Sequence, residues 1–136
     1  MDRLEIAVDD VLYRRIHPDH IHPQTRRVSS AAFVGDDAFN LSVELAALTT
    51  PQAVMDYAAK VGQDCFGVAA FTAGEAREIG FEVKHDPLPE TDPDGPNPAH
   101  CLVIGEKEHP GRKPAKKLSR KCKSVWPTEL LALNTD

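Results

Sequence analysis

The sequence predicts an α+β domain: one mixed sheet of about five or six strands, with two to three helices mainly on one face. Three observations support this prediction. Apolar residues alternate with polar ones over residues 39–45, the pattern of a half-buried strand. A capped amphipathic stretch follows at residues 51–61. Short apolar runs and helical segments then alternate towards the C-terminus, without an internal repeat.

Length and charge limit the classes of protein to consider. With 136 residues, we expect a single domain over residues 1–136 that buries its own core. Residues 1–105 carry 17 acidic and 8 basic side chains, whereas residues 106–136 carry 4 acidic and 8 basic ones. An acidic body argues against nucleic-acid binding by the whole domain, but the basic C-terminal part permits a local contact with an anion.

The first half of the chain predicts strands and one clear helix. Residues 11–16 indicate a strand that ends before Pro18, and residues 27–34 continue the strand region up to a turn. After the alternating strand at 39–45, Thr50 is a good N-cap for a helix over residues 51–61.

The second half predicts a crossover and a long loop. Strands are expected at residues 65–71 and 81–84, on either side of a helix at 73–79 that begins with the capping-box pattern Thr72-Ala73-Gly74-Glu75. The segment 41–84 therefore indicates one βαβ crossover with a parallel pair of strands.

The remaining segments complete the expected fold. A proline-rich segment at 86–98 lacks periodicity and predicts a loop, long enough to suggest function or mobility. A strand is expected at 99–105, and a basic amphipathic C-terminal helix at 114–126 that ends before Pro127.

The three cysteines indicate the compartment. Cys65, Cys101 and Cys122 are far apart and form no CxxC pair, so we expect inert reduced thiols in the cytoplasm. The sequence shows neither a signal-peptide pattern nor an apolar run long enough to span a membrane, which agrees with that expected location. His100 and Cys101 are adjacent in a predicted strand, point to opposite faces and cannot form a catalytic pair.

Half of the six histidines lie in one stretch, His17-Pro18-Asp19-His20-Ile21-His22-Pro23. Histidines and carboxylates are common zinc ligands, so the candidate metal ligands are His17, His20, His22 and, from another strand, His100, with His85 next. The spacing matches no named metal motif. The competing interpretation is a stiff surface loop and a protein with no cofactor.

Arg14, Ser29-Ser30 and Glu106-Lys107-Glu108 resemble, in this order, the Arg, Ser-x-Ser/Thr and Glu-x-Glu constellation of ADP-ribosyltransferases. The resemblance implies that Arg14 would hold the phosphates of a nicotinamide dinucleotide, and that a glutamate would stabilise the reacting sugar. The alternative is that Arg14 and Arg15 are charges at a strand edge and that the serines are ordinary strand residues.

The predicted C-terminal helix has a basic face. Opposite Leu118 and Cys122 lie the candidate anion-binding residues Lys116, Lys117, Arg120 and Lys121. Such a face fits phosphates or an acidic partner. A solvated amphipathic helix is the competing interpretation.

A series of short phrases runs along residues 12–105. They are Leu12-Tyr13-Arg14, His17-Pro18, Val28-Ser29-Ser30-Ala31-Ala32-Phe33, Leu41-Ser42-Val43, Gly67-Val68, Asp86-Pro87 and Asn97-Pro98-Ala99-His100. Together they resemble a family of small uncharacterised bacterial proteins. The resemblance implies a cytoplasmic bacterial single domain and attaches no activity. It makes Arg14, His17, Ser30 and His100 the candidate catalytic residues.

The leading functional hypothesis is a small cytoplasmic accessory or binding protein that acts through a protein partner, because the sequence contains no complete catalytic motif and no glycine-rich phosphate loop. The first alternative is a small enzyme with a metal or nucleotide pocket between residues 17–22, Ser29-Ser30 and His100. The second is weak nucleic-acid binding by the C-terminal helix. The balance of motifs leans against an enzyme.

Overall fold

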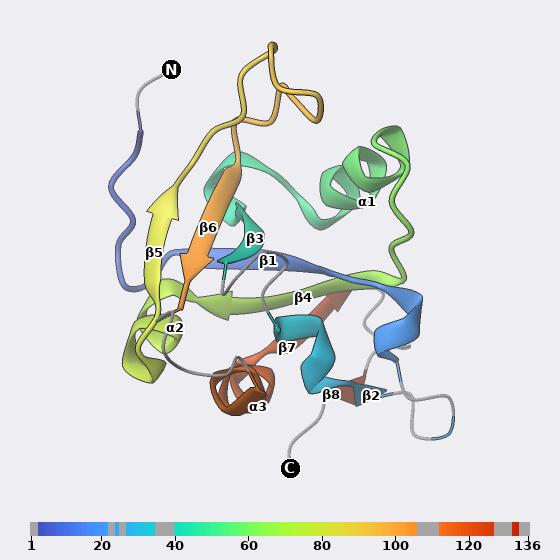
Figure 1. Cartoon of the computed structure of the whole chain (residues 1–136), viewed down its shortest axis with the longest axis vertical. Coiled ribbons are helices and arrows are strands. Elements are labelled where there is room, and N and C mark those ends of the chain that lie inside the picture. The colour runs from blue at the N-terminus through green and yellow to red at the C-terminus, as the bar shows by residue number, and fades with distance from the viewer. Residues whose placement is uncertain are drawn as a thin grey trace.

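The computed structural model describes residues 3–21, 24, 27–34, 40–105, 112–126 and 132–133. It contains a six-stranded sheet with the strand order β5-β6-β3-β1-β4-β7 (Figure 1). The strands are β1 (Val11–Ile16), β3 (Asn40–Leu45), β4 (Gly67–Thr72), β5 (Glu82–His85), β6 (His100–Ile104) and β7 (Lys123–Trp126).

The α+β class is confirmed, but the prediction of a mixed sheet is wrong for the described strands. Each described pairing within this sheet is antiparallel. The predicted crossover exists, because α1 (Pro51–Lys60) connects β3 to β4. These two strands run in the same direction but do not pair, since β1 lies between them and pairs with both. Periodicity within residues 41–84 carries no information about a strand inserted from earlier in the chain.

The helices cover both faces of the sheet, and most of them lie on one. α2 (Ala73–Ile79), α3 (Arg112–Lys121) and the 3₁₀ helix η2 (Ser30–Phe33) contribute to the main hydrophobic core. α1 packs over β1 and β4 on the other side, where it buries Val54 and Ala58. Figure 1 shows α1 and α3 on opposite sides of these two strands. None of the described helices is long and apolar enough to cross a membrane.

The predicted starts of the first two helices are confirmed, whereas α3 begins at Arg112, two residues before the predicted start. The Thr50 hydroxyl accepts a hydrogen bond from the Ala53 amide at 3.1 Å and so caps α1. Thr72 and Glu75 form the reciprocal capping box at the start of α2. Gly80 ends α2 with φ of 113°, a left-handed conformation that glycine adopts without strain.

The predicted helix over residues 114–126 is too long. α3 ends at Lys121, and residues 123–126 form β7 against β4. An unpaired edge of β4 would expose main-chain donors and acceptors, and their pairing outweighs the helical spacing of Cys122 and Val125.

The predicted strand region at residues 27–34 is also divided. Of these residues only β2 (Arg27–Val28) forms a strand, and it pairs in parallel with β8 (Ala132–Leu133). The Ser29 hydroxyl accepts a hydrogen bond from the Ala31 amide at 3.2 Å and caps η2, so Ser29-Ser30 are not strand residues.

The proline-rich segment at 86–98 extends the β5–β6 hairpin. Leu88 and Asn97 exchange two main-chain hydrogen bonds, each of 2.9 Å. A side chain at Gly95 would place its Cβ 1.8 Å from the Pro89 carbonyl oxygen, so this turn requires glycine. The segment therefore has a defined conformation held by its own main-chain bonds. We call residues 86–98 the hairpin extension.

Candidate functional site

Polar side chains gather on the face of the sheet that α1 covers. Successive residues of a strand point to opposite faces, and β1 buries Leu12 and Ile16 towards the main core. The strand register pairs Tyr13 with Glu44, and Glu44 with His100. These three side chains therefore lie side by side on β1, β3 and β6. With Arg15 and Ser42, they line a narrow recess that we call the polar recess.

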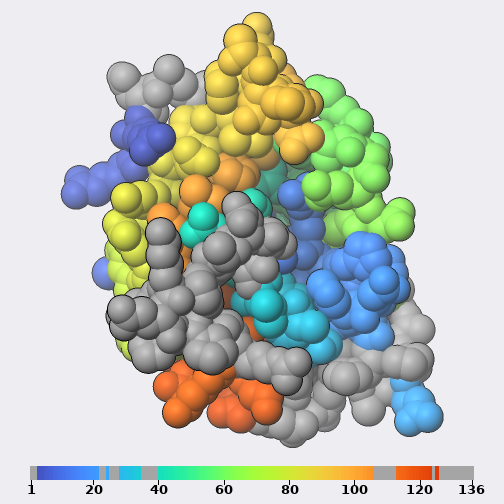
Figure 2. Space-filling view, in the orientation of Figure 1, coloured from blue at the N-terminus to red at the C-terminus, as the bar shows by residue number. Residues whose placement is uncertain are grey.

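The polar recess adjoins a larger cleft of about 720 Å³, which shares Arg15 and Ser42 with it. The described residues that line this cleft are Arg14, Arg15, His17, Asp19, His20, Ser42, Gly62, Gln63 and Asp64. Figure 2 shows blue atoms of β1 between α1, in green, and the yellow-to-orange hairpin, but none of the described hairpin residues lines the cleft. Segments that are distant in the sequence thus surround one opening.

The cleft exists because β1 and β3 separate. β1 pairs with β4 as far as Ile16, whereas its register with β3 covers Leu12 and Tyr13. The buried guanidinium of Arg14 fills the gap: Nε donates to the Ala32 carbonyl at 2.9 Å, and Nη1 donates to the Ser42 carbonyl at 2.9 Å. Arg14 thereby satisfies main-chain acceptors that lie beyond the β1–β3 register.

Glu44 contributes a buried carboxyl group to the polar recess, because the residue is only 5% exposed. Its Oε1 accepts a hydrogen bond from Asn97 Nδ2 at 3.0 Å, whereas Oε2 is buried without a hydrogen-bond partner among the described residues. Burial raises the pKa of Glu44, and the hydrogen bond from Asn97 and the charge of Arg15 oppose that shift only in part.

Arg15 presents a second unsatisfied buried atom. Its Nη1 has no hydrogen-bond partner in the described part of the chain. The guanidinium carbon lies 5.5 Å from the centre of the Tyr57 ring, a cation–π contact between β1 and α1. The Tyr57 hydroxyl donates a hydrogen bond to the Asp94 carbonyl, which connects α1 to the hairpin extension. Burial raises the pKa of Tyr57.

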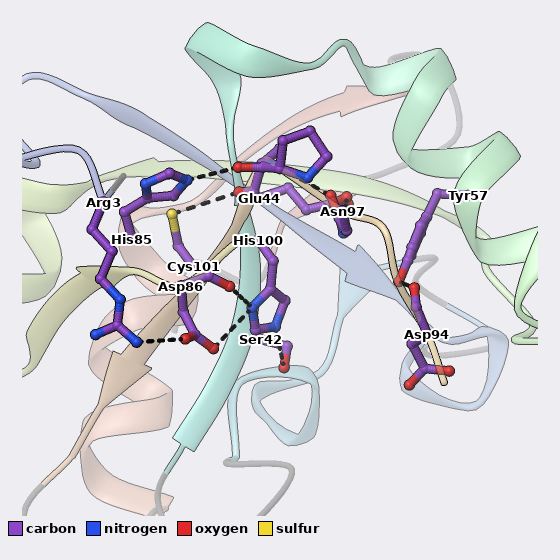
Figure 3. Close-up of polar contacts among 12 residues, drawn as sticks. Arg3, Ser42, Glu44, Tyr57, His85, Asp86, Asp94, Asn97, His100 and Cys101 are labelled. Carbon is purple, nitrogen blue, oxygen red and sulfur yellow. Dashed lines mark hydrogen bonds and ion pairs between the residues drawn. The ribbon is translucent and has the colours of Figure 1, made fainter. Parts of the chain in front are cut away.

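His100 connects Asp86 to Ser42 (Figure 3). Its Nδ1 lies 2.8 Å from the Asp86 carbonyl oxygen and 3.3 Å from the Asp86 carboxylate, and its Nε2 lies 3.3 Å from the Ser42 hydroxyl. The Asp86 carboxylate also contacts the Arg3 guanidinium at 3.4 Å. The His100 side chain is 12% exposed, so the protein surrounds most of the ring.

The structure separates the candidate residues that the sequence groups into one pocket. Arg14, His17 and His20 line the cleft, and His100 lines the adjoining polar recess. Ser30 lies elsewhere, in a second cleft of about 480 Å³ that it shares with Ala31, Lys113 and Lys116. His22 lies outside the described residues.

The candidate metal ligands have other partners. His17 Nδ1 accepts a hydrogen bond from the Asp19 amide at 3.0 Å and so caps the 3₁₀ helix η1 (Pro18–His20). The same nitrogen lies 3.6 Å from the Asp19 carboxylate. Across the described residues, no group of three His, Cys, Asp or Glu side chains could hold a metal ion. Zinc binding stays a prediction.

His85, the next candidate ligand, is buried and uses both ring nitrogens. Nδ1 accepts a hydrogen bond from the Leu4 amide at 2.8 Å, which requires Nε2 to donate to the Pro98 carbonyl at 2.6 Å. His85 therefore fastens the N-terminal segment and the hairpin extension to β5.

The residues that resemble an ADP-ribosyltransferase site have structural roles where they are described. Two donors of Arg14 bind main-chain carbonyls, and Ser29 caps η2. Glu106 and Glu108 lie outside the described residues.

The cysteines agree with the expectation of inert thiols. Burial raises the pKa of Cys101 to about 12, and the pKa of Cys122 well above its ordinary value. Burial also raises the pKa of the half-buried Cys65. A thiol reacts as its thiolate, so none of the three is activated as a nucleophile.

The predicted anion-binding side chains are exposed on α3. These are Lys116, Lys117, Arg120 and Lys121. Their exposure is compatible with anion binding and equally with a solvated face, so this assignment stays a prediction.

The sequence interpretation missed most of the polar recess. Ser42 and Glu44 belong to the polar half of the alternation at 39–45, which predicts their common face but no function. Asp86 and Asn97 lie in a segment interpreted only as a loop. The available signal was the density of polar residues in the Asn97-Pro98-Ala99-His100 phrase, but their neighbours across the sheet are long-range contacts that no local pattern reveals.

Comparisons with known proteins do not assign this site. No protein-family model matches this chain, and neither a curated protein nor a solved structure does. The resemblance of its short phrases to a bacterial family therefore stays a prediction, and the function has to be argued from the geometry.

Proposed function

We propose that the cleft, at its border with the polar recess, binds a small polar ligand that presents both a hydrogen-bond acceptor and a donor. The observation that supports this proposal is the pair of unsatisfied buried atoms, Arg15 Nη1 and Glu44 Oε2, on residues that line the same recess. Leaving a buried polar group without a partner costs about 1–3 kcal/mol. A ligand acceptor at Arg15 and a ligand donor at Glu44 would recover that cost.

The ligand class follows from these two groups. Primary amides and ureas carry a carbonyl acceptor and an N–H donor on the same carbon. The carbonyl would accept from Arg15, and the N–H would donate to Glu44. The polar recess itself is closed and has no room for a water molecule, so the body of the ligand would occupy the adjoining cleft of about 720 Å³, which shares Arg15 and Ser42 with the recess. That volume lies within the usual range of small-molecule sites, about 300–1,000 Å³.

The walls of the recess are held in place before any ligand arrives. Asn97 orients the Glu44 carboxyl group, and the Tyr57 ring lies against the Arg15 guanidinium. The bond from Tyr57 to Asp94 joins the two covering elements, α1 and the hairpin extension. A preorganised site loses less conformational entropy on binding, which favours affinity for a small ligand.

The test is a thermal-shift screen of amides and ureas against the matched carboxylic acids and ketones, followed by calorimetry of the best compound. We expect stabilisation by compounds that carry both groups, and at least a 10-fold loss of affinity in Arg15→Met and Glu44→Gln. The matched controls are Lys60→Met and Glu82→Gln, whose side chains are exposed outside the recess. Equal affinity in the four variants would place binding elsewhere and contradict the proposal.

A protein partner and nucleic-acid binding through α3 are separate proposals. The exposed basic side chains of α3 support both, since such a face attracts phosphates and acidic proteins alike. A salt titration with duplex DNA tests the nucleic-acid proposal, which predicts affinity that falls steeply with salt and is lost in Lys117→Glu/Lys121→Glu. A pull-down with the same variant tests the partner.

A further inference from the structure

Ser42, His100 and Asp86 form a chain of serine, imidazole and carboxylate at the polar recess (Figure 3). The hydroxyl oxygen of Ser42 lies 3.3 Å from His100 Nε2, and His100 Nδ1 lies 3.3 Å from the Asp86 carboxylate. A hydroxyl within hydrogen-bond reach of a base, with a third group orienting that base, is the geometric signature of an activated nucleophile.

The contacts of the ring determine where its proton lies. Nδ1 lies close to two acceptors, the Asp86 carbonyl and carboxylate oxygens, so the proton of the neutral ring belongs on Nδ1. Nε2 is then an acceptor that faces the Ser42 hydroxyl. This tautomer lets His100 take the hydroxyl proton when Ser42 reacts.

Ser42 lies where a substrate would arrive. It lines both the open cleft and the polar recess, and Arg14 holds its carbonyl oxygen at 2.9 Å. Arg15, which lines the same two cavities, has the buried Nη1 donor that lacks a partner among the described residues. A fixed donor in the wall of the cavity that holds the nucleophile would stabilise the negative charge that develops on a carbonyl oxygen under attack.

We infer that the protein hydrolyses small esters or amides bound in the cleft, with Ser42 as nucleophile and His100 as general base at the border with the polar recess. The inference rests on the proposed function, because the bound carbonyl group is the one attacked. Asp86 is a positioning residue that orients the ring, and Arg15 binds the carbonyl oxygen.

Each step balances in protons and bonds. Ser42 Oγ attacks the carbonyl carbon, and its proton passes to His100 Nε2. The bond to the leaving alcohol or amine breaks, and that group takes the proton. A water molecule then attacks the acyl-serine while it gives one proton to Nε2. The acyl group leaves as a carboxylic acid, and the proton on Nε2 returns to Oγ.

The experiment uses the full chain and a small alkyl fluorophosphonate, from which an activated serine displaces fluoride. We expect one adduct by intact mass, located at Ser42 by peptide sequencing and lost in Ser42→Ala but not in Ser30→Ala. General-base assistance is commonly a factor of about 10²–10⁴, so His100→Gln should slow labelling at least 100-fold.

A split between rate and binding tests the positioning role. Asp86→Asn should lower the maximal labelling rate and leave the half-saturating probe concentration unchanged, and the matched variant Asp94→Asn should change neither. Thermal melts identify any variant that fails to fold. If His100→Gln does not fold, His100→Asn takes its place in the comparison.

Two results overturn the inference. One is a folded wild-type protein without an adduct at Ser42, and the other is equal labelling in the folded His100 variant. Failure of the proposed function is distinguishable, because ligand binding depends on Arg15 and Glu44 and is measured without the probe. Amide binding without labelling rejects only the hydrolytic step.

Discussion

At the level of one residue, the protonation of Glu44 in the candidate site affects the free energy of unfolding. Burial raises its pKa above the ordinary value of 4.5, so the folded protein binds this proton more tightly than the unfolded chain does. The stabilising effect of that proton is complete below pH 4.5 and is lost as the pH rises through the pKa of the folded state. At neutral pH the buried carboxylate therefore opposes folding.

Glu44→Gln removes this titration and keeps an oxygen that accepts from Asn97. We expect the variant to gain stability over the wild type as the pH rises, by about 1.4 kcal/mol for each unit of pKa shift. Urea unfolding of both proteins from pH 4 to pH 8 measures the difference in their free energies of unfolding. The contributions of the other titratable groups are common to both proteins and cancel in this difference. A difference that is constant with pH, or that grows on acidification, would contradict the burial of this charge.

At the level of one element, the conformation of the hairpin extension depends on Gly95. A Cβ there would meet the Pro89 carbonyl oxygen at 1.8 Å, so Gly95→Ala must displace main chain. We expect a loss of at least about 1 kcal/mol of stability, as for other strained backbone substitutions. Because Asn97 is two residues away and holds Glu44, affinity for the amide ligand should fall as well.

Hydrogen exchange checks this prediction locally. The Leu88 and Asn97 amides are paired across the extension, so both should exchange faster in Gly95→Ala than in the wild type. Glu90→Ala, at an exposed position of the same segment, is the control. Unchanged protection of both amides in Gly95→Ala would show that the turn adapts without loss of its pairing.

α3 contributes one face to the hydrophobic core and exposes a second, basic face to solvent. Leu118 is fully buried in the same core cluster as the inner residues of β1, β3 and β6. Leu118→Ala should cost about 2–5 kcal/mol in one cooperative transition. Lys117→Ala on the exposed face should change stability by no more than about 0.5 kcal/mol. Urea denaturation followed by circular dichroism and by fluorescence measures both, and a separate early transition in Leu118→Ala would contradict a single core.

The polar recess is likewise a property of the whole molecule. Its residues come from β1, β3 and β6, and the groups that hold them come from α1 and the hairpin extension. Asp86 and His100 are 14 residues apart, and Ser42 is 58 residues from His100. Only the antiparallel register of β3 with β6 brings Ser42 and His100 within reach of each other.

The sequence by itself determined the features that depend on neighbours along the chain. Thr50 caps α1 because a cap needs only an amide two or three residues ahead, and the alternation at 39–45 assigns Ser42 and Glu44 to one face because side chains alternate in any strand. The α+β class follows from such local patterns.

The tertiary structure alone decided the order of the strands and the composition of the site. β1 enters between β3 and β4, residues 123–126 leave the helical pattern for the free edge of β4, and the hairpin extension brings Asn97 to Glu44. Each of these depends on main-chain pairing or burial between segments distant in the sequence. Local periodicity contains no information about such partners, so the recess becomes visible only in the folded chain.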